Sequence, residues 1–366
     1  MLILTWKLPY TQFMSSLTEI SVTTRKLAIW LGIGLIVYVV FKSLFSLGIS
    51  YWKATHKPPP VLPNVLFGKL PAPVFPKGAT SSAGFKFILE NIEGQPPETT
   101  PSGKVYVMPK KAPTILSSQR AKAFATKLGF VSEPEVLSAT YYRFTNALDK
   151  LLTLEVDIIT MNFKFKYDYT KNPQIFFQGT IKSKEQAINE VKGYIGNNGL
   201  FDSVTATGKV TADILKFDVP TKTFSPASSL SNTDAVRINF FRNDLDGLKI
   251  LPPLFDKSYN YVLYTASNSN SWKFPEVLYT YWPIDSTNFA IYPLRSGTAA
   301  WQNLIDGQAT IVSLGKNSPN VVIIRNIYLA YYDSEDPQIY LQPIFVFEGD
   351  NNFVAYLPAV DSQWLE

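Results

Sequence analysis

The hydrophobic pattern of the chain is dominated by one apolar run near its beginning. This run extends from Leu27 to Trp52 and contains a single charged residue, Lys42. Its first fifteen residues, 27–41, carry no charge, and about 20 apolar residues are needed to cross a bilayer. The whole run is long enough if Lys42 lies near the headgroups and extends its ammonium group toward them. The pattern therefore predicts one transmembrane helix over residues 27–52.

The ends of this run are typical of a membrane anchor. Two cations precede it and aromatic residues lie toward both ends, and two glycines offer a small surface for a partner helix. The predicted anchor residues are Arg25, Lys26, Trp30, Gly32, Gly34, Lys42 and Trp52. A cleaved signal peptide is the alternative, but its apolar core would span about 7–15 residues and a small-residue cleavage site would follow. No such site follows convincingly, so an uncleaved anchor is favoured.

A proline-rich stretch follows the apolar run. Prolines recur through residues 57–76 and again through 95–103, with a short strand candidate at 85–91 between them. Repeated prolines exclude helix and favour an extended, semi-rigid backbone. Residues 53–103 are therefore predicted to be a tether that holds the rest of the chain away from the lipid.

The remaining sequence alternates short helical patterns with longer series of strands. Apolar residues recur at helical spacing in 117–130, 183–195 and 296–305, and Ser183 with Gln186 forms a capping-box pattern. Strand patterns follow each helix, as in 151–158, where Leu154 and Val156 alternate with Glu155 and Asp157. The other predicted strands are 139–145, 162–169, 204–210, 214–219, 235–242, 260–265, 276–282, 289–294, 310–314, 321–332, 339–348 and 353–360.

This arrangement predicts an α+β fold with an N-terminal transmembrane helix. Two or three β-rich modules would follow, each an antiparallel sheet with a short helix packed on it. The predicted boundaries are a cytoplasmic segment at 1–26, the membrane helix at 27–52, the tether at 53–103, and modules at 104–178, 179–257 and 258–366.

The residue types needed for catalysis are scarce. The chain has no cysteine and one histidine, His56, which lies in the predicted tether. A Ser-His-Asp triad would have to recruit that residue from a linker, and only carboxylates remain as zinc ligands elsewhere. The pair Gly32 and Gly34 lies inside the membrane run and forms no nucleotide-binding fingerprint. We therefore expect no enzymatic activity and no cofactor.

Three acidic clusters are candidate sites. Residues 242–247 resemble part of a calcium loop but lack the downstream glutamate, so a hairpin turn is the stronger interpretation. Glu155 and Asp157 could act as an acid and base pair, although an exposed strand face explains them more simply. Residues 333–337 form an acidic loop for which a solvated hairpin end is expected.

The charge of the chain is mild, at +5. Nucleic-acid binding requires clustered cations with interleaved aromatics, and Lys164 with Lys166 is the only local candidate. Alternation on a half-exposed strand accounts for that pair, so no nucleic-acid partner is expected. Lys53 and Lys57 are placed to contact anionic headgroups. The high aromatic content, 14%, is assigned to strand cores, with a sugar groove as the weaker alternative.

A family resemblance appears in the later segments. These are a helix with Ala300 and Trp301, a strand ending at 329–332, a strand built on 343–347, a final strand ending at 358–360, and the middle segment 236–247. They resemble YycH/YycI-type proteins over about residues 104–360, and the modules resemble PepSY-like units. The proline tether and the long N-terminal lead depart from that pattern.

The resemblance implies a single-pass protein with an extracytoplasmic body that adjusts a cell-wall-sensing histidine kinase. We therefore expect a cell-membrane protein with a cytoplasmic N-terminus, the lipid bilayer and an envelope protein as partners, and possible self-association. The envelope partner would be a sensor kinase or another single-pass protein. Two alternatives stay open: an inhibitor or chaperone of a secreted protease or cell-wall enzyme, and a structural envelope protein. A carboxylate-based hydrolase that uses Glu155 and Asp157 is a weaker interpretation.

Overall fold

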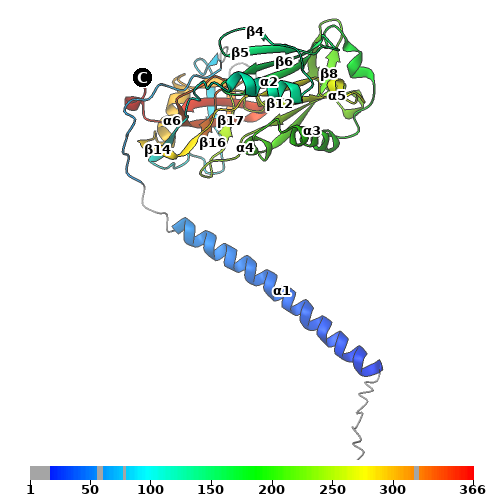
Figure 1. Cartoon of the computed structure of the whole chain (residues 1–366). Helices are drawn as coiled ribbons and strands as arrows, with labels where there is room; N and C mark the ends of the chain where they lie inside the picture. The colour runs from blue at the N-terminus through cyan, green and yellow to red at the C-terminus, as the bar shows by residue number, and fades with distance from the viewer. Residues whose placement is uncertain (1–16, 56–60, 77–79, 317–320) are drawn as a thin grey trace, which may run out of the picture. The chain divides into compact units, whose positions relative to one another are not determined.

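The structure, a computed structural model, describes residues 17–55, 61–76, 80–316 and 321–366. The chain divides into two compact units, 1–59 and 60–366, which are coloured along the chain in Figure 1. The predicted α+β class is confirmed: the described chain combines an N-terminal apolar helix, few other helices, and sheets in which most strands pair antiparallel.

The first unit contains helix α1 (Leu17–Thr55), 39 residues long. At 1.5 Å per residue its length is about 58 Å. The part from Arg25 to Ile49 has a mean hydropathy of 2.1 and is not buried at all, and it is the one described helix long and apolar enough to span a membrane. Trp30 is 71% exposed and Trp52 is 61% exposed. A single apolar helix at this position agrees with the predicted anchor.

The glycines and cations of α1 remain open to the surroundings. A Cβ added at Gly32 or Gly34 would meet no atom within 4 Å, and Arg25, Lys26 and Lys42 are exposed. Helix α1 also continues beyond the predicted end of the span, to Thr55, so the first residues of the predicted tether are helical. The lone histidine, His56, lies outside the described residues.

The second unit contains two nine-stranded sheets. In the first sheet, every neighbouring pair is antiparallel. Its strands lie in the order β4 (Glu135–Val136), β5 (Tyr141–Thr145), β6 (Leu152–Asp157), β7 (Phe163–Tyr167), β13 (Glu276–Tyr279), β12 (Tyr261–Tyr264), β10 (Ala235–Phe240), β8 (Val210–Asp218) and β9 (Thr223–Pro226).

The second sheet is built around two long strands near the end of the chain, β16 with 12 residues and β17 with 10. Its main order is β1 (Thr80–Ser81), β15 (Thr310–Ser313), β18 (Phe353–Pro358), β17 (Tyr340–Gly349), β16 (Val321–Tyr332) and β11 (Ile250–Leu251). Strand β2 (Lys86–Leu89) and β11 both run parallel to β16. Strand β3 (Ser102–Val107) pairs with β14 (Asp285–Pro293) and with β17. Figure 1 shows β14, β16 and β17 beside α6 in one half of this unit.

Short helices cover parts of both sheets. Helix α2 (Ser117–Lys127) and α3 (Lys184–Asn198) pack their small and branched residues, such as Ala121 and Val191, on one face of the first sheet. Helix α6 (Gly297–Ile305) places Ala300 and Leu304 in the core of the second. The remaining short helices are α4 (Ser203–Ala206), α5 (Asn270–Lys273), η1 (Pro173–Phe177), η2 (Leu230–Asn232), η3 (Asp350–Asn352) and η4 (Ser362–Trp364).

The predicted tether is wrong for most of its length. Strands β1 and β2 pair with β15 and β16, Leu70 is fully buried, and the Tyr292 hydroxyl donates to the Gly68 carbonyl at 2.8 Å. Prolines prevent helix, but an extended chain can still lie along a sheet and bury its apolar side chains. From residue 61 onward, the described part of this stretch belongs to the body.

The three predicted modules are also corrected. Strands β12 and β13, assigned to the module 258–366, pair with β10 and β7 of the earlier modules. Strand β3, at the start of the module 104–178, pairs with β14 and β17. Each sheet therefore collects strands from distant parts of the sequence, which a series of local helix-and-strand units does not anticipate.

One predicted strand is a helical turn instead. Residues 204–210 were predicted to be extended, but Ser203–Ala206 forms α4 and β8 begins only at Val210. The Asp202 carboxylate accepts hydrogen bonds from the amides of Val204 and Thr205 at 2.8 and 3.1 Å. This N-cap outweighs the β preference of the branched residues that follow.

Candidate functional site

One face of the first sheet carries polar side chains across its central strands. Successive residues of a strand point to opposite faces. The residues that alternate with the core, and that align in register across β7, β13, β12, β10 and β8, define what we call the open face. They are Lys164, Lys166, Glu276, Leu278, Tyr261, Leu263, Arg237, Asn239, Asp213 and Thr211.

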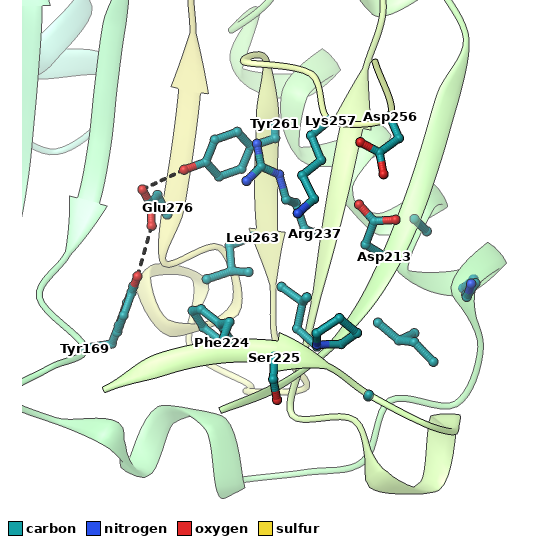
Figure 2. Close-up of a pocket in the computed structure, with 16 residues that line it drawn as sticks. Tyr169, Asp213, Phe224, Ser225, Arg237, Asp256, Lys257, Tyr261, Leu263 and Glu276 are labelled. Carbon is teal, nitrogen blue, oxygen red and sulfur yellow. Dashed lines mark hydrogen bonds between the residues drawn. The ribbon is translucent and has the colours of Figure 1, made fainter. Parts of the chain in front are cut away.

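A pocket of about 640 Å³ lies over half of the open face. Arg237, Tyr261 and Glu276 form its floor, the edge strand β9 contributes Phe224, and the turn before β12 contributes Asp256 and Lys257, as Figure 2 shows. This volume lies within the range of sites for small ligands, about 300–1,000 Å³. We call it the Arg237 pocket.

Two tyrosines hold the carboxylate of Glu276 at one end of this pocket. The Tyr261 hydroxyl donates to Oε1 at 2.8 Å and the Tyr169 hydroxyl to Oε2 at 3.3 Å. Burial, followed by the nearby charge of Glu276, raises the pKa of both hydroxyl groups above the ordinary value of 10.0. Both tyrosines therefore stay protonated and act as donors to the carboxylate.

The guanidinium group of Arg237 is fixed in the middle of the pocket. It stacks on the Tyr261 ring, with Cζ 3.7 Å from the ring centroid. Its Nε donates to the Asn239 side-chain oxygen at 3.0 Å, and one terminal nitrogen donates to the Ser258 carbonyl at 2.8 Å. Asn239 is fully buried and also donates to Asp213 at 2.8 Å. One buried amide thus orients both a cation and an anion of the pocket.

Opposite charges line the pocket in similar number. Lys184, Arg237 and Lys257 supply cations, and Asp213, Asp256 and Glu276 supply anions. Within the described part of the chain, none of the three cations forms an ion pair with a carboxylate. The arrangement can accept charged groups of both signs.

The predicted acid and base pair is engaged in structural contacts. The Arg143 guanidinium donates to the Glu155 carboxylate, from Nε at 2.9 Å and from a terminal nitrogen at 2.8 Å. One carboxylate oxygen of Asp157 accepts the amides of Ile159 and Thr160 at 2.8 and 3.2 Å. Lys164 and Lys166 lie opposite Glu155 and Thr153 on the neighbouring strand. Asp157 is only 8% exposed, so the expected exposed strand face is wrong for this residue, whereas Glu155 is half-buried. Strand alternation accounts for the two lysines.

Residues 242–247 form the predicted hairpin turn and not a calcium loop. Leu245 pairs with Leu248, and Asp246 and Gly247 have positive φ angles of 52° and 77°. Asp246 accepts from Tyr106 and pairs with Lys104 at 2.9 Å. The described residues contain no group of three or more histidine, cysteine or acidic residues placed to hold a metal ion.

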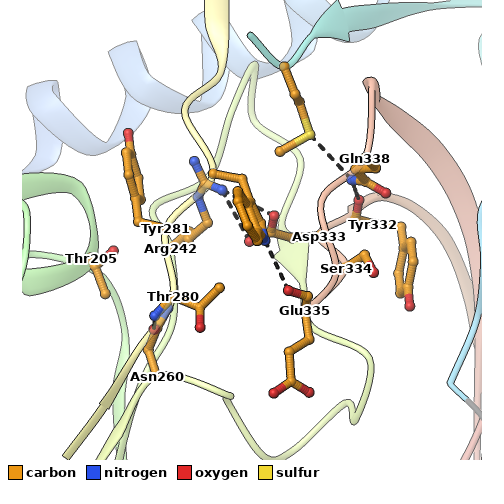
Figure 3. A network of polar contacts seen from close by, with 12 residues as sticks. Thr205, Arg242, Asn260, Thr280, Tyr281, Tyr332, Asp333, Ser334, Glu335 and Gln338 are labelled. Atoms are coloured by element: carbon orange, nitrogen blue, oxygen red, sulfur yellow. Dashed lines mark hydrogen bonds and ion pairs between the residues drawn. The ribbon is translucent and has the colours of Figure 1, made fainter. Parts of the chain in front are cut away.

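The predicted solvated loop at 333–337 begins with a buried ion pair. Asp333 and Arg242 are 3.1 Å apart, with side chains 3% and 5% exposed, and Figure 3 shows the two groups facing each other. Tyr259 also donates to Asp333, and the Trp282 indole donates to the Glu335 carbonyl at 3.0 Å. The expectation of a fully solvated hairpin end was wrong, because a buried arginine from the neighbouring sheet needs this carboxylate.

The sequence pattern does not mark the pocket residues as a site. Arg237 and Asn239 fall on the polar positions of the apolar segment 235–240, which is a visible but weak signal. Asp256, Tyr169 and Glu276 come from separate segments, and only the sheet brings them together. The predicted anchor residues, by contrast, all lie on α1.

Comparisons with known proteins identify no family. No family model matches the chain, and no curated protein matches it. One similar solved structure is that of an uncharacterized protein from Eubacterium rectale, with 10% sequence identity and a TM-score of 0.39. The match covers 75% of this chain and 87% of the other. A likeness at this level carries no argument about function.

Proposed function

We propose that this chain is a non-enzymatic, membrane-anchored protein whose body binds a partner on the open face of the first sheet. The observation that carries the proposal is the Arg237 pocket, where fixed polar groups line about 640 Å³ on the open face. Buried networks such as Asn239 with Arg237 and Asp213 keep these groups in place before anything binds.

We also propose a location for the protein. Helix α1 is long and apolar enough to span a membrane, and we place the body outside the cytoplasm, with the chain's first residues inside. The resemblance to YycH/YycI-type proteins supports an envelope protein, such as a sensor kinase, as the partner. Contacts that occupy Glu155 and Asp157 support a role in binding over hydrolysis.

Site-specific photo-crosslinking of the full-length protein in intact cells tests the binding face. A photoreactive residue at Ser225, which lines the pocket and is exposed, should crosslink one discrete membrane protein. The matched control is Ile92, which is fully exposed but lies outside the first sheet. Identical products from both positions, or none from Ser225, would contradict the proposed face.

Protease treatment of intact cells tests the topology. The body should be cleaved from outside while the cell remains sealed, and it should become protected in inverted vesicles. Protection in intact cells with cleavage only after lysis would reverse the proposed orientation.

A further inference from the structure

The Arg237 guanidinium uses only some of its N–H donors for hydrogen bonds within the described part of the chain. A guanidinium group carries five N–H donors in a rigid fork. Two of these donors, Nε and one terminal nitrogen, have protein acceptors, which are the Asn239 side-chain oxygen and the Ser258 carbonyl. Stacking on Tyr261 at 3.7 Å holds the plane of the group. The remaining donors are oriented in advance, which is the arrangement that suits bidentate binding of an oxyanion.

The acidic groups near Arg237 are engaged elsewhere. Glu276 accepts from two tyrosines and Asp213 accepts from Asn239. On the same sheet, Arg143 contrasts with Arg237, because Glu155 and Glu135 both pair with it. Across the residues that the structure describes, Arg237 has no such acidic partner. A half-buried cation of this kind is stabilised further when a ligand brings a carboxylate.

The other charges of the pocket restrict the ligand class. Asp213, Asp256 and Glu276 line the same space and would repel a doubly charged phosphate group. Figure 2 shows Asp213 and Asp256 on one side of the pocket and Tyr261 on the other. Arg237 and Lys257 lie in the middle. A carboxylate beside Arg237 therefore leaves room for an ammonium group beside the two aspartates.

We propose that the Arg237 pocket binds a zwitterionic, peptide-like ligand. Its carboxylate would bind the guanidinium of Arg237, and its ammonium group would lie beside Asp213 and Asp256. Its apolar side chain would extend toward Phe224 and Leu263, on the other side of Arg237. This ligand class rests on the proposed function, in which the same pocket binds a partner. The two charges come either from a free amino acid or short peptide, or from a partner's C-terminal residue with a nearby lysine.

Binding of four small probes to the full-length protein in lipid nanodiscs distinguishes these sources. Alanyl-alanine carries both charges, whereas its N-acetyl and C-terminal amide derivatives each carry one. N-acetyl-alanyl-lysine imitates a C-terminal lysine. We expect calorimetry or NMR titration to show binding of at least one doubly charged probe, with about tenfold or greater loss when either charge is masked.

Two outcomes identify the source of the charges. Binding of alanyl-alanine alone indicates a small zwitterion, and binding of N-acetyl-alanyl-lysine alone indicates the end of a partner chain. Equal binding of the charged and masked probes, or no binding of any probe at millimolar concentration, would overturn the inference.

Variants assign the roles of individual charges. Arg237→Gln should abolish binding, and Arg237→Lys should weaken it about tenfold because the fork geometry is lost. The control is Arg143→Gln on the same sheet, which should leave binding unchanged. Asp256→Asn, at an exposed turn, is expected to leave folding intact and to reduce the preference for the probe with a free ammonium group. An unchanged preference in this variant would reject the assigned ammonium position.

Different experimental results would reject the ligand class and the proposed function. If Ser225 crosslinks a discrete membrane protein but no probe binds, the pocket face binds a partner by other chemistry and the zwitterion assignment falls. If probes bind with the expected charge dependence but no crosslink forms, the ligand class is supported and the proposed protein partner is rejected.

Discussion

At the scale of single residues, Arg242 and Asp333 decide how the two sheets are joined. Arg242 follows β10 of the first sheet and Asp333 follows β16 of the second. Both side chains are almost fully buried, and the Arg242 guanidinium also lies over the Tyr281 ring, 4.8 Å from its centroid. Each charge is acceptable in this interior only because the other is present.

Removing one of these charges should therefore be costly. We expect Asp333→Asn to lower the free energy of unfolding by about 3–5 kcal/mol, because a buried guanidinium is left without its counter-ion. Urea denaturation of the full-length protein measures this loss. The control is Glu90→Gln, which removes the exposed partner of Arg325 and should cost less than about 1 kcal/mol. Similar losses in the free energy of unfolding of the two variants would show that the buried ion pair contributes no more to stability than the exposed one.

At the scale of secondary-structure elements, α3 shows how local sequence sets helix limits. The Ser183 hydroxyl accepts the Gln186 amide at 3.0 Å, which caps the first turn. Gly199 ends the helix with a φ of 57°, a left-handed conformation that glycine adopts without strain. The buried stripe, Ala187, Val191 and Ile195, lies between these signals and packs on the first sheet.

Loss of the Ser183 cap should weaken the whole unit. Ser183→Ala is expected to reduce the free energy of unfolding by about 1 kcal/mol, because an amide of the first turn loses its acceptor. Ser183→Asp keeps an acceptor at the same position and should preserve stability. Chemical denaturation followed by circular dichroism compares the three proteins. A loss of the same size in Ser183→Asp would indicate that the hydroxyl acts through another contact.

At the scale of the whole molecule, the body begins much earlier in the sequence than expected. The strands β1 and β2 and the buried Leu70 all precede residue 104, where the first module was predicted to start. The described strands between residues 80 and 103 therefore belong to the second sheet.

Two truncations test this boundary. A fragment that begins at residue 60 should fold with a cooperative thermal transition, because it keeps β1, β2 and Leu70. A fragment that begins at Lys104 should be markedly less stable or fail to fold, because these contacts with β15, β16 and the surrounding core are lost. Equal melting temperatures for the two fragments would mean that residues 60–103 contribute nothing to the body.

The many buried tyrosines should also make the body sensitive to alkali. Burial, followed by the charge of Glu276, raises the pKa of Tyr261, and burial with a hydrogen bond to Glu348 raises that of Tyr328. A raised pKa means that the folded protein holds the proton more tightly than the unfolded chain. This contribution to stability is complete below the ordinary value of 10.0 and is lost as the pH rises above it.

Urea denaturation at several pH values, combined with tyrosinate absorbance, measures this effect. The midpoint should fall steadily above about pH 10, and the buried tyrosines should ionise together with unfolding. Ordinary titration of all tyrosines near pH 10 in the folded protein, without loss of stability, would contradict the assigned hydrogen bonds.

The sequence by itself determined the features whose physical causes are local. Apolar length predicted α1, the Ser183 cap predicted the start of α3, and alternating apolar residues predicted strands such as β16 with correct limits. Each of these depends on residues a few positions apart, where hydrogen bonding and burial follow directly from spacing.

Only the tertiary structure decided which strands are neighbours and which charges share a space. The pairing of β13 with β7 joins segments more than a hundred residues apart, and it places Glu276 within reach of Tyr169. Arg242 likewise forms an ion pair with Asp333, which follows a strand of the other sheet. A single strand has the same alternation whichever partner it takes, so the pocket and the buried ion pair arise from sheet register and from the burial of both sheets in one body.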